Sequence, residues 1–219
     1  MAKKARTPPP PRSRQQGPRR REPTRVPPWS DRRLLVGGGA VLVAIALIAI
    51  TLASRGGGGA SAASARRAAT VLTAAGCTFR TYPSQGRDHV QSLDAKVDYN
   101  SFPPTSGRHY FQPAVWNRYS QPLVLVQEVH NLEHGGVIIQ YGDEISPATV
   151  QQLTSFYDSS PNAMLLAPLP KLGGKIALTA WTRLAACTRF SQRAFKAFRD
   201  TFRGKGPEGF PVSALTPGS

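Results

Sequence analysis

The sequence predicts an α+β domain that is closed by a disulfide and tethered to a membrane by one helix. Three observations lead to this prediction. Residues 34–53 form an uncharged apolar run, strand and helix patterns follow one another as β-α-β-β-α from residue 136 to residue 203, and the only two cysteines lie near the ends of the outer segment. This order of elements requires one sheet with helices packed on a face, which is an α+β architecture.

Residues 1–33 are predicted to be a disordered, basic, proline-rich cytoplasmic tail. They hold eight prolines and 11 Lys or Arg residues against two acidic residues. Such a segment has too little apolar surface to offset the entropy cost of ordering. It also fits a ligand for an anionic surface or for a proline-binding module, but a tail held in the cytoplasm by its charges is the simpler interpretation.

The apolar run at residues 34–53 is predicted to be a single transmembrane helix. Twenty helical residues rise about 30 Å, which matches the hydrocarbon core of a bilayer. A cleaved signal peptide is the alternative, but its apolar and basic regions are usually shorter. Seven Lys or Arg residues precede the run within 20 positions and three follow it, so the N-terminus is expected in the cytoplasm. We therefore expect a single-pass plasma-membrane protein with residues 54–219 outside the cytoplasm.

The net charge of +16 does not indicate a specific nucleic-acid binder. Residues 71–219 hold 14 basic and 10 acidic residues, so most of the charge lies before the folded segment. The strongest basic run adjoins the apolar run, where it suits anionic lipid headgroups. The partners expected from the sequence are the membrane and an envelope protein.

Residues 54–70, which are rich in Gly, Ala and Ser, predict a flexible linker. An Ala-rich helix is expected from about residue 66 to residue 75, ended by Gly76, and it would lift the domain off the membrane. Cys77 and Cys187 are expected to form a disulfide, because an even pair in an oxidising compartment favours one. Two free thiols and a thiolate metal site are the alternatives. Closing so long a loop contributes about 4–5 kcal/mol in the chain-entropy model.

The outer domain is predicted to occupy residues 71–205, followed by a flexible C-terminal tail at 206–219. Turn residues punctuate its first part, with short strands at 96–99 and 123–129. The later elements are a strand at 136–141, a helix opened by Ser146 and Pro147 that runs to about residue 157, a strand at 163–167, a turn at 171–174, a strand at 175–183 that completes a hairpin, and a helix at 191–203. A ferredoxin-like fold and a fold like the second half of thioredoxin both fit this order.

Three phenylalanines, Phe195, Phe198 and Phe202, share one side of the last helix, and basic residues surround the remainder. An aromatic stripe with this spacing is expected to cover the sheet. A basic amphipathic helix that rests on anionic lipid is the alternative.

The four histidines of the chain are the candidate functional residues: His89, His109, His130 and His134. His130 and His134 are four positions apart, so they share one face of a helical turn at a separation that suits one metal ion, and Gly135 can end that turn. Neutral imidazole binds zinc and copper well, and Glu133 fits a ligand, a partner of a ligand or a base. We expect His109, His130 and His134 as ligands, with His89 the fourth and Glu133 beside them.

A structural network is the alternative to a metal site. In that case His109 and His134 stabilise loops through backbone carbonyls, and Glu133 pairs with Arg108 or Arg87. Three nitrogens and an open position would permit hydrolysis, whereas four would indicate a closed structural or carrier site. The identity of the cofactor, zinc or copper if there is one, is left open.

Residues 130–134 also have the form H-x-x-E-H, the inverted zinc-peptidase motif, in which both histidines bind zinc and the glutamate activates water. That motif needs a long helix and a carboxylate ligand from another helix. Here Gly135 and Gly136 interrupt the helix, and the only later glutamates, Glu144 and Glu208, lie in loop-like contexts. We therefore favour a binding protein over an enzyme and assign no catalytic residue, with a zinc hydrolase that uses Glu133 as an alternative.

Three blocks of this sequence resemble the signatures of the DUF3105 family: RDHV at 87–90, YNSFPPTSGRHY at 99–110 and VHNLEHGGVIIQY at 129–141. The resemblance covers roughly residues 71–205. It implies a membrane-anchored, extracytoplasmic prokaryotic domain of unknown function and supplies no catalytic assignment. We therefore expect a membrane protein that presents a His-rich pocket to a ligand or partner, with a divalent metal as the candidate cofactor. A structural or assembly partner of a membrane complex, without metal, is the alternative.

Overall fold

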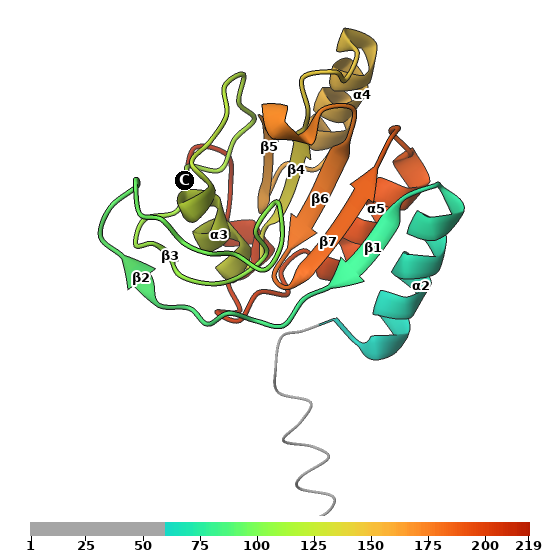
Figure 1. Cartoon of the computed structure of the whole chain (residues 1–219). Coiled ribbons are helices and arrows are strands. Elements are labelled where there is room, and N and C mark those ends of the chain that lie inside the picture. The colour runs from blue at the N-terminus through green and yellow to red at the C-terminus, as the bar shows by residue number, and fades with distance from the viewer. Residues whose placement is uncertain (1–59) are drawn as a thin grey trace, which may run out of the picture. The chain divides into compact units, whose positions relative to one another are not determined.

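A five-stranded mixed sheet forms the centre of the computed structural model, which describes residues 60–219 (Figure 1). The strands lie in the order β1-β7-β6-β4-β5. Their bounds are Thr78–Thr81 for β1, Val137–Tyr141 for β4, Met164–Pro168 for β5, Ile176–Ala180 for β6 and Arg183–Cys187 for β7. Only β4 and β5 are parallel, and the other neighbours are antiparallel. The predicted α+β class is therefore confirmed.

Helices cover both faces of the sheet, and the alternation of side chains along β4 assigns the faces. Val137 and Ile139 point into a core with α2 (Ala62–Ala74), α4 (Pro147–Asp158) and α5 (Gln192–Phe202). Ile138, between them, points into a second core beneath α3 (Leu125–Glu133). His130 lies in α3 and His134 caps its C-terminal end, and the rings of His89 and His109 lie next to His130. All four histidines therefore lie on the α3 side of the sheet.

Several predicted elements are confirmed by the structure. The strand predicted at 136–141 is β4, and the helices predicted at 146–157 and 191–203 are α4 and α5. Ser146 and Ser191 cap these helices, accepting hydrogen bonds from the backbone amides of Thr149 and Ala194. The three phenylalanines of α5 are buried, so its aromatic stripe covers the sheet as expected rather than resting on lipid.

The predicted hairpin between residues 163–167 and 175–183 is wrong. β5 and β6 do not pair, because β4 lies between them and bonds to both. α4 returns the chain so that β5 adds in parallel to one edge of β4, and β6 must then take the other edge. The second predicted strand also ends early: the chain turns at Trp181 and Thr182, and β7, which was not predicted, forms the true hairpin with β6.

Two further expectations in the first half of the domain are corrected. Residues 96–99 form no strand, and the strand predicted at 123–129 is replaced by the helix α3. Val126, Val129 and Leu132 are buried at the helical spacing of three residues, so packing against the sheet selects helix over the strand preference of valine. The remaining short strands, β2 (His89–Val90) and β3 (His109–Tyr110), form a separate parallel pair.

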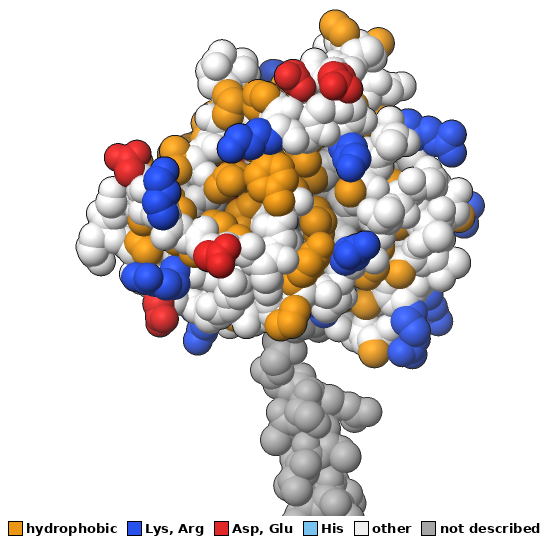
Figure 2. Space-filling view, viewed as in Figure 1, with side chains coloured by type: hydrophobic (Ala, Val, Ile, Leu, Met, Phe, Trp, Pro, Cys, Tyr) orange, Lys and Arg blue, Asp and Glu red, His pale blue; other side chains and the backbone are white. Residues whose placement is uncertain are grey.

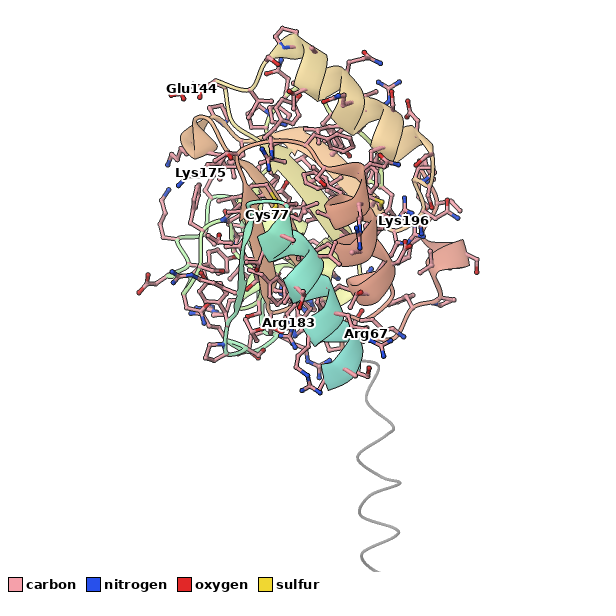
Figure 3. All side chains as sticks on the ribbon, turned by 90° about the vertical axis from the view of Figure 1, so that its right-hand side faces the viewer. Arg67, Cys77, Glu144, Lys175, Arg183 and Lys196 are labelled. Carbon is pink, nitrogen blue, oxygen red and sulfur yellow. A yellow bond between two sulfur atoms is a disulfide. The ribbon has the colours of Figure 1, made fainter. Side chains whose placement is uncertain are left out.

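α2 is part of the fold rather than a spacer. It begins at Ala62, within the predicted linker, and lies beside α5, as Figures 1 and 3 both show. Ala68 and Leu72 of α2 are buried in the main core. The disulfide between Cys77 and Cys187 is confirmed, which rules out free thiols and a thiolate metal site.

The C-terminal segment, predicted to be a flexible tail from residue 206, is packed against the domain. Leu215 is buried in the α3-side core, and its carbonyl accepts a hydrogen bond from the amide of Ala163. Trp116 exchanges backbone hydrogen bonds with Gly218 and Ser219. A segment with these buried contacts does not behave as a free tail.

Within residues 60–219 no helix combines the length and the apolar character that crossing a bilayer requires. The predicted transmembrane helix at 34–53, the tail at 1–33 and the start of the predicted linker lie outside the described residues.

Candidate metal centre

Backbone pairing brings together two histidines that lie far apart in the chain. β2 and β3 run parallel with His89 opposite His109, and the amide of His109 donates to the carbonyl of Asp88 at 3.0 Å. β3 also contacts α3, since Nδ1 of His130 lies 2.7 Å from the carbonyl oxygen of Tyr110. Three imidazoles from three segments therefore converge on one side of α3.

Four side chains form what we call the inner cluster: His89, His109, His130 and Glu133. One nitrogen or oxygen atom from each lies within 4.8 Å of the corresponding atom of every other member. The side chain of His109 is 0% exposed and that of Glu133 is 3% exposed, whereas His89 is exposed. The cluster is therefore buried at His109 and Glu133 and reaches solvent at His89.

Hydrogen bonding determines which ring nitrogens of the inner cluster are free. Nδ1 of His109 lies 2.8 Å from the carbonyl oxygen of Gly107, and Nδ1 of His130 makes the similar contact with Tyr110. A carbonyl oxygen only accepts, so both Nδ1 atoms must be the protonated ones. In each neutral ring Nε2 is then left with a free lone pair, which is the form that binds a metal ion.

The pair formed by His109 and Glu133 lacks a partner. Nε2 of His109 lies 3.0 Å from Oε2 of Glu133, and neither of these buried atoms makes a hydrogen bond within residues 60–219. A lone pair and a carboxylate oxygen at this distance need a cation or a proton between them. Ligand atoms around a tetrahedral zinc ion are about 3.3 Å apart, given zinc–nitrogen bonds of about 2.0–2.1 Å, so the observed spacing fits a shared ion.

Burial sets the charge state of the site. It lowers the pKa of His109 and of His130 and raises the pKa of Glu133, because each charged form is less well solvated inside the protein. Burial therefore favours the neutral, metal-binding form of the His109 and His130 imidazoles.

Three side chains form a second group, which we call the outer cluster: His130, His134 and Glu208. Nε2 of His130 lies 3.0 Å from Nε2 of His134, which in turn lies 2.9 Å from Oε2 of Glu208. His134 and Glu208 are 15% and 33% exposed, so this cluster is more open than the buried part of the inner one. Burial lowers the pKa of His134 as well.

The predicted set of five residues thus divides into two overlapping groups. His89, His109, His130 and Glu133 lie together, whereas His134 turns toward Glu208 and shares only His130 with the inner cluster. Sequence reasoning missed Glu208 as a site residue because it lies in a loop 74 positions after His134.

Glycines explain how Glu208 reaches α3. A side chain at Gly206 would place its Cβ 2.2 Å from the carbonyl oxygen of Glu133, so only glycine permits this approach. The amide of Gly204 donates to the carbonyl of Gly135 at 2.7 Å, and the amide of Glu208 to that of Glu133 at 3.4 Å. Glycines at 204 and 206 were the available signal for a close backbone contact.

The predicted alternative pairing of Glu133 with arginine is present only in part. Nε of Arg87 lies 3.7 Å from Oε1 of Glu133, and the Arg87 side chain is 55% exposed. Such an exposed ion pair contributes about 0–1 kcal/mol. Within residues 60–219, Arg108 makes no ion pair with Glu133; its carbonyl instead accepts from the hydroxyl of Tyr99 at 2.7 Å.

Other residues of α3 hold the site in place. The side chain of Asn131 is buried and bonds to both the amide and the carbonyl of Ala114, which fastens the preceding loop to the helix. The carboxylate of Glu128 is buried and accepts two hydrogen bonds from Nε2 of Gln140 on β4. These contacts stiffen the helix that presents His130 and Glu133.

The helix that carries the H-x-x-E-H residues is short, as the two glycines after it predicted. α3 ends at Glu133, and His134 is its C-cap. A carboxylate does meet His134, but it comes from the loop residue Glu208 rather than from a helix. Oε2 of Glu133 faces the buried His109, so this carboxylate oxygen is turned away from solvent.

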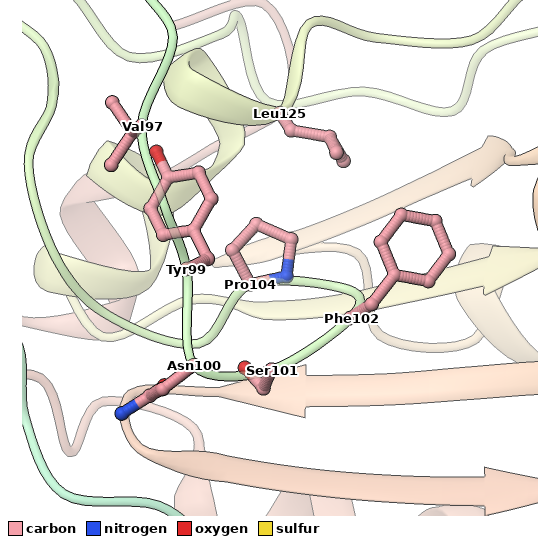
Figure 4. Close-up of a pocket in the computed structure, with 7 residues that line it drawn as sticks. All are labelled: Val97, Tyr99, Asn100, Ser101, Phe102, Pro104 and Leu125. Atoms are coloured by element: carbon pink, nitrogen blue, oxygen red, sulfur yellow. The ribbon is translucent and has the colours of Figure 1, made fainter.

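A separate hollow of about 470 Å³ lies beside the start of α3 (Figure 4). Its walls are mostly apolar and include no histidine; they are Val97, Tyr99, Asn100, Ser101, Phe102, Pro104 and Leu125. Hydrophobic side chains also gather near the centre of the face shown in Figure 2. The hollow and the imidazole clusters are distinct features of the molecule.

Comparison with known proteins identifies the family. The model of the family described as "Protein of unknown function (DUF3105)" matches residues 89–213, a range that contains every member of both clusters. The chain therefore belongs to the DUF3105 family, as the sequence blocks indicated. No curated protein and no solved structure matches this chain.

Proposed function

We propose that this domain binds one transition-metal ion, zinc or copper, at the inner cluster, and presents it on the outer side of the plasma membrane. The observation on which the proposal rests is the buried, unpartnered pair formed by Nε2 of His109 and Oε2 of Glu133. Leaving two such atoms unpaired costs about 1–3 kcal/mol for each, a cost that a bound cation removes.

The composition of the cluster supports zinc or copper over magnesium or calcium. Three imidazoles and one carboxylate are nitrogen-rich ligands, whereas magnesium and calcium prefer oxygen alone. Four ligands complete a tetrahedral zinc shell, which favours a structural or carrier site over a hydrolytic one. In the bound state the backbone carbonyls of Gly107 and Tyr110 would orient the rings of His109 and His130.

The proposed location rests on the sequence outside the described residues and on the disulfide. An apolar run of membrane-spanning length at 34–53 follows a strongly basic segment. The disulfide between Cys77 and Cys187 suits an oxidising compartment. Alkaline phosphatase, which is active only outside the cytoplasm, should be active when fused after Ser219 and inactive when fused before Met1 of the intact chain. Activity of the second fusion and silence of the first would overturn the orientation.

Metal binding is tested on the full chain in detergent micelles after chelator treatment. Zinc or copper at about 100 times its dissociation constant should raise the free energy of unfolding by about 2.7 kcal/mol. Elemental analysis should find one ion per chain. His109→Ala and Glu133→Gln should abolish both effects, whereas the control Glu144→Gln, at an exposed glutamate outside both clusters, should leave them unchanged.

The proposal fails if the wild-type chain retains neither ion and its melting temperature does not respond to either one. It also fails if the two site variants bind as much metal as the Glu144→Gln control.

A further inference from the structure

The two clusters share one residue, His130, and its one free lone pair limits how they can be used. Nδ1 of His130 donates to the carbonyl of Tyr110, so Nε2 offers the only lone pair of the ring. His130 belongs to both clusters, and its Nε2 is the atom that lies 3.0 Å from Nε2 of His134. One lone pair coordinates one ion, so His130 can serve the two positions only in turn.

The outer cluster has more hydrogen-bond acceptors than protons to donate to them, as expected of a position that binds a cation. Nε2 of His130 carries no proton, yet it lies 3.0 Å from Nε2 of His134, which also lies 2.9 Å from a carboxylate oxygen of Glu208. A proton on His134 can point well at only one of these two acceptors. His130 is 6% exposed as a residue, and its Nε2 faces His134 within the outer cluster.

Charge favours arrival of a cation at the outer cluster. Glu208 is one-third exposed, and His134 is its one ion-pair partner in the part of the chain that the structure describes. On the other open side, beside His89, the guanidinium of Arg87 lies next to Glu133. A carboxylate attracts an approaching cation and a guanidinium repels it, with effects on association rates that reach about 10–1,000-fold for steered encounters.

The number of ligands favours movement from the outer to the inner cluster. The outer cluster offers two nitrogens and one oxygen, whereas the inner cluster offers three nitrogens and one oxygen. Because both include His130, an ion can exchange His134 and Glu208 for His109, Glu133 and His89 without losing its bond to His130. The step forms and breaks only coordinate bonds and needs no redox partner.

We propose that His134 and Glu208 form a loading position, at which a zinc ion first binds together with His130 before it moves into the inner cluster. This inference rests on the proposed function, since it assumes that the inner cluster is the resting place of the ion. The His134–Glu208 pair then acts on the rate of exchange and not on the final affinity.

The rates of zinc uptake and release by the full chain in detergent micelles test the inference. Metal-free protein is mixed with zinc bound to a coloured chelator, and the absorbance follows the transfer; release is followed after addition of excess chelator. His134→Ala and Glu208→Gln should each slow uptake about tenfold or more. Because the dissociation constant is the ratio of the two rates, release should slow by the same factor while zinc content stays at one ion per chain.

The double variant should be no slower than about the slower single variant, because both residues serve one position. Glu144→Gln is the matched control and should leave both rates unchanged. Thermal melting of the metal-free variants checks that each is folded, and Glu208→Gln keeps the shape of its side chain if His134→Ala proves unstable.

Each other outcome separates the two proposals. Unchanged uptake and release in folded His134→Ala and Glu208→Gln, with zinc still bound, would overturn the loading position and leave the inner site standing. Loss of bound zinc in both variants would make His134 and Glu208 permanent ligands, which also overturns it, as would two tightly bound ions per wild-type chain. Absence of zinc binding by the wild-type chain would remove the proposed function itself.

Discussion

The substitution Glu133→Gln should stabilise the metal-free protein while abolishing metal binding. In the wild-type chain Oε2 of Glu133 faces the bare Nε2 of His109 at 3.0 Å, so two buried acceptors oppose each other. A glutamine can place its NH₂ group at the same position and donate to His109. Its other oxygen still faces Arg87, whose contact with Oε1 is long and exposed.

The magnitude follows from the cost of unpaired buried groups. Satisfying one such contact recovers about 1–3 kcal/mol, and weakening the exposed pair with Arg87 costs at most about 1 kcal/mol. For a domain of this size each kcal/mol moves the melting temperature by about 2–4 °C, so the net gain of up to about 3 kcal/mol predicts a rise of up to about 12 °C in the presence of a chelator. The gain should shrink as the pH falls, because a protonated Glu133 can itself donate to His109.

The measurement is thermal unfolding of the full chain in detergent, with chelator and with zinc, at neutral and acidic pH. Glu144→Gln, at an exposed glutamate, is the control for loss of a negative charge and should change little. If Glu133→Gln lowers the melting temperature of the metal-free protein at neutral pH, then Glu133 is already well paired and the argument for a missing cation is wrong.

Three further predictions concern the stability of the domain. Burial raises the pKa of Glu128 to about 8, so the folded state keeps a proton that the unfolded state loses near the ordinary value of 4.5. Through this group, the free energy of unfolding should therefore fall as the pH rises from about 4.5 to about 8, whereas the lowered pKa values of the buried histidines act in the opposite direction. Glu128→Gln should remove this fall, which denaturant titrations at several pH values can measure. Equal pH slopes in the wild type and the variant would refute the prediction. Replacing Cys77 and Cys187 together by alanine should cost about 3–5 kcal/mol in denaturant unfolding, because the disulfide closes a loop with a sequence separation of 110, and a change below about 1 kcal/mol would contradict this. Gly206→Ala should cost about 1–3 kcal/mol by forcing its Cβ against the carbonyl of Glu133, and a melting temperature equal to that of the wild type would show that the segment yields freely.

Local signals predicted the elements that depend on neighbours in the chain. The β-branched run at 136–141, the Ser-Pro start of α4 and the aromatic stripe of α5 each specify an element by themselves. The hairpin between 163–167 and 175–183 was wrong because strand pairing is a competition between distant partners, and β4 takes both strands. The C-terminal tail was misjudged for a similar reason, since Leu215 gains its burial from residues distant in the chain.

The spacing of His130, Glu133 and His134 was enough to place these side chains within one helical turn, because residues three and four positions apart in a helix are neighbours on its surface. Tertiary structure alone decided what meets them. The pairing of β2 with β3 brings His89 and His109 to one side, and the contact of Gly206 with the end of α3 brings Glu208 to the other. The division into two clusters depends on where loops lie in space, and loop positions are set by packing between segments that no local pattern relates.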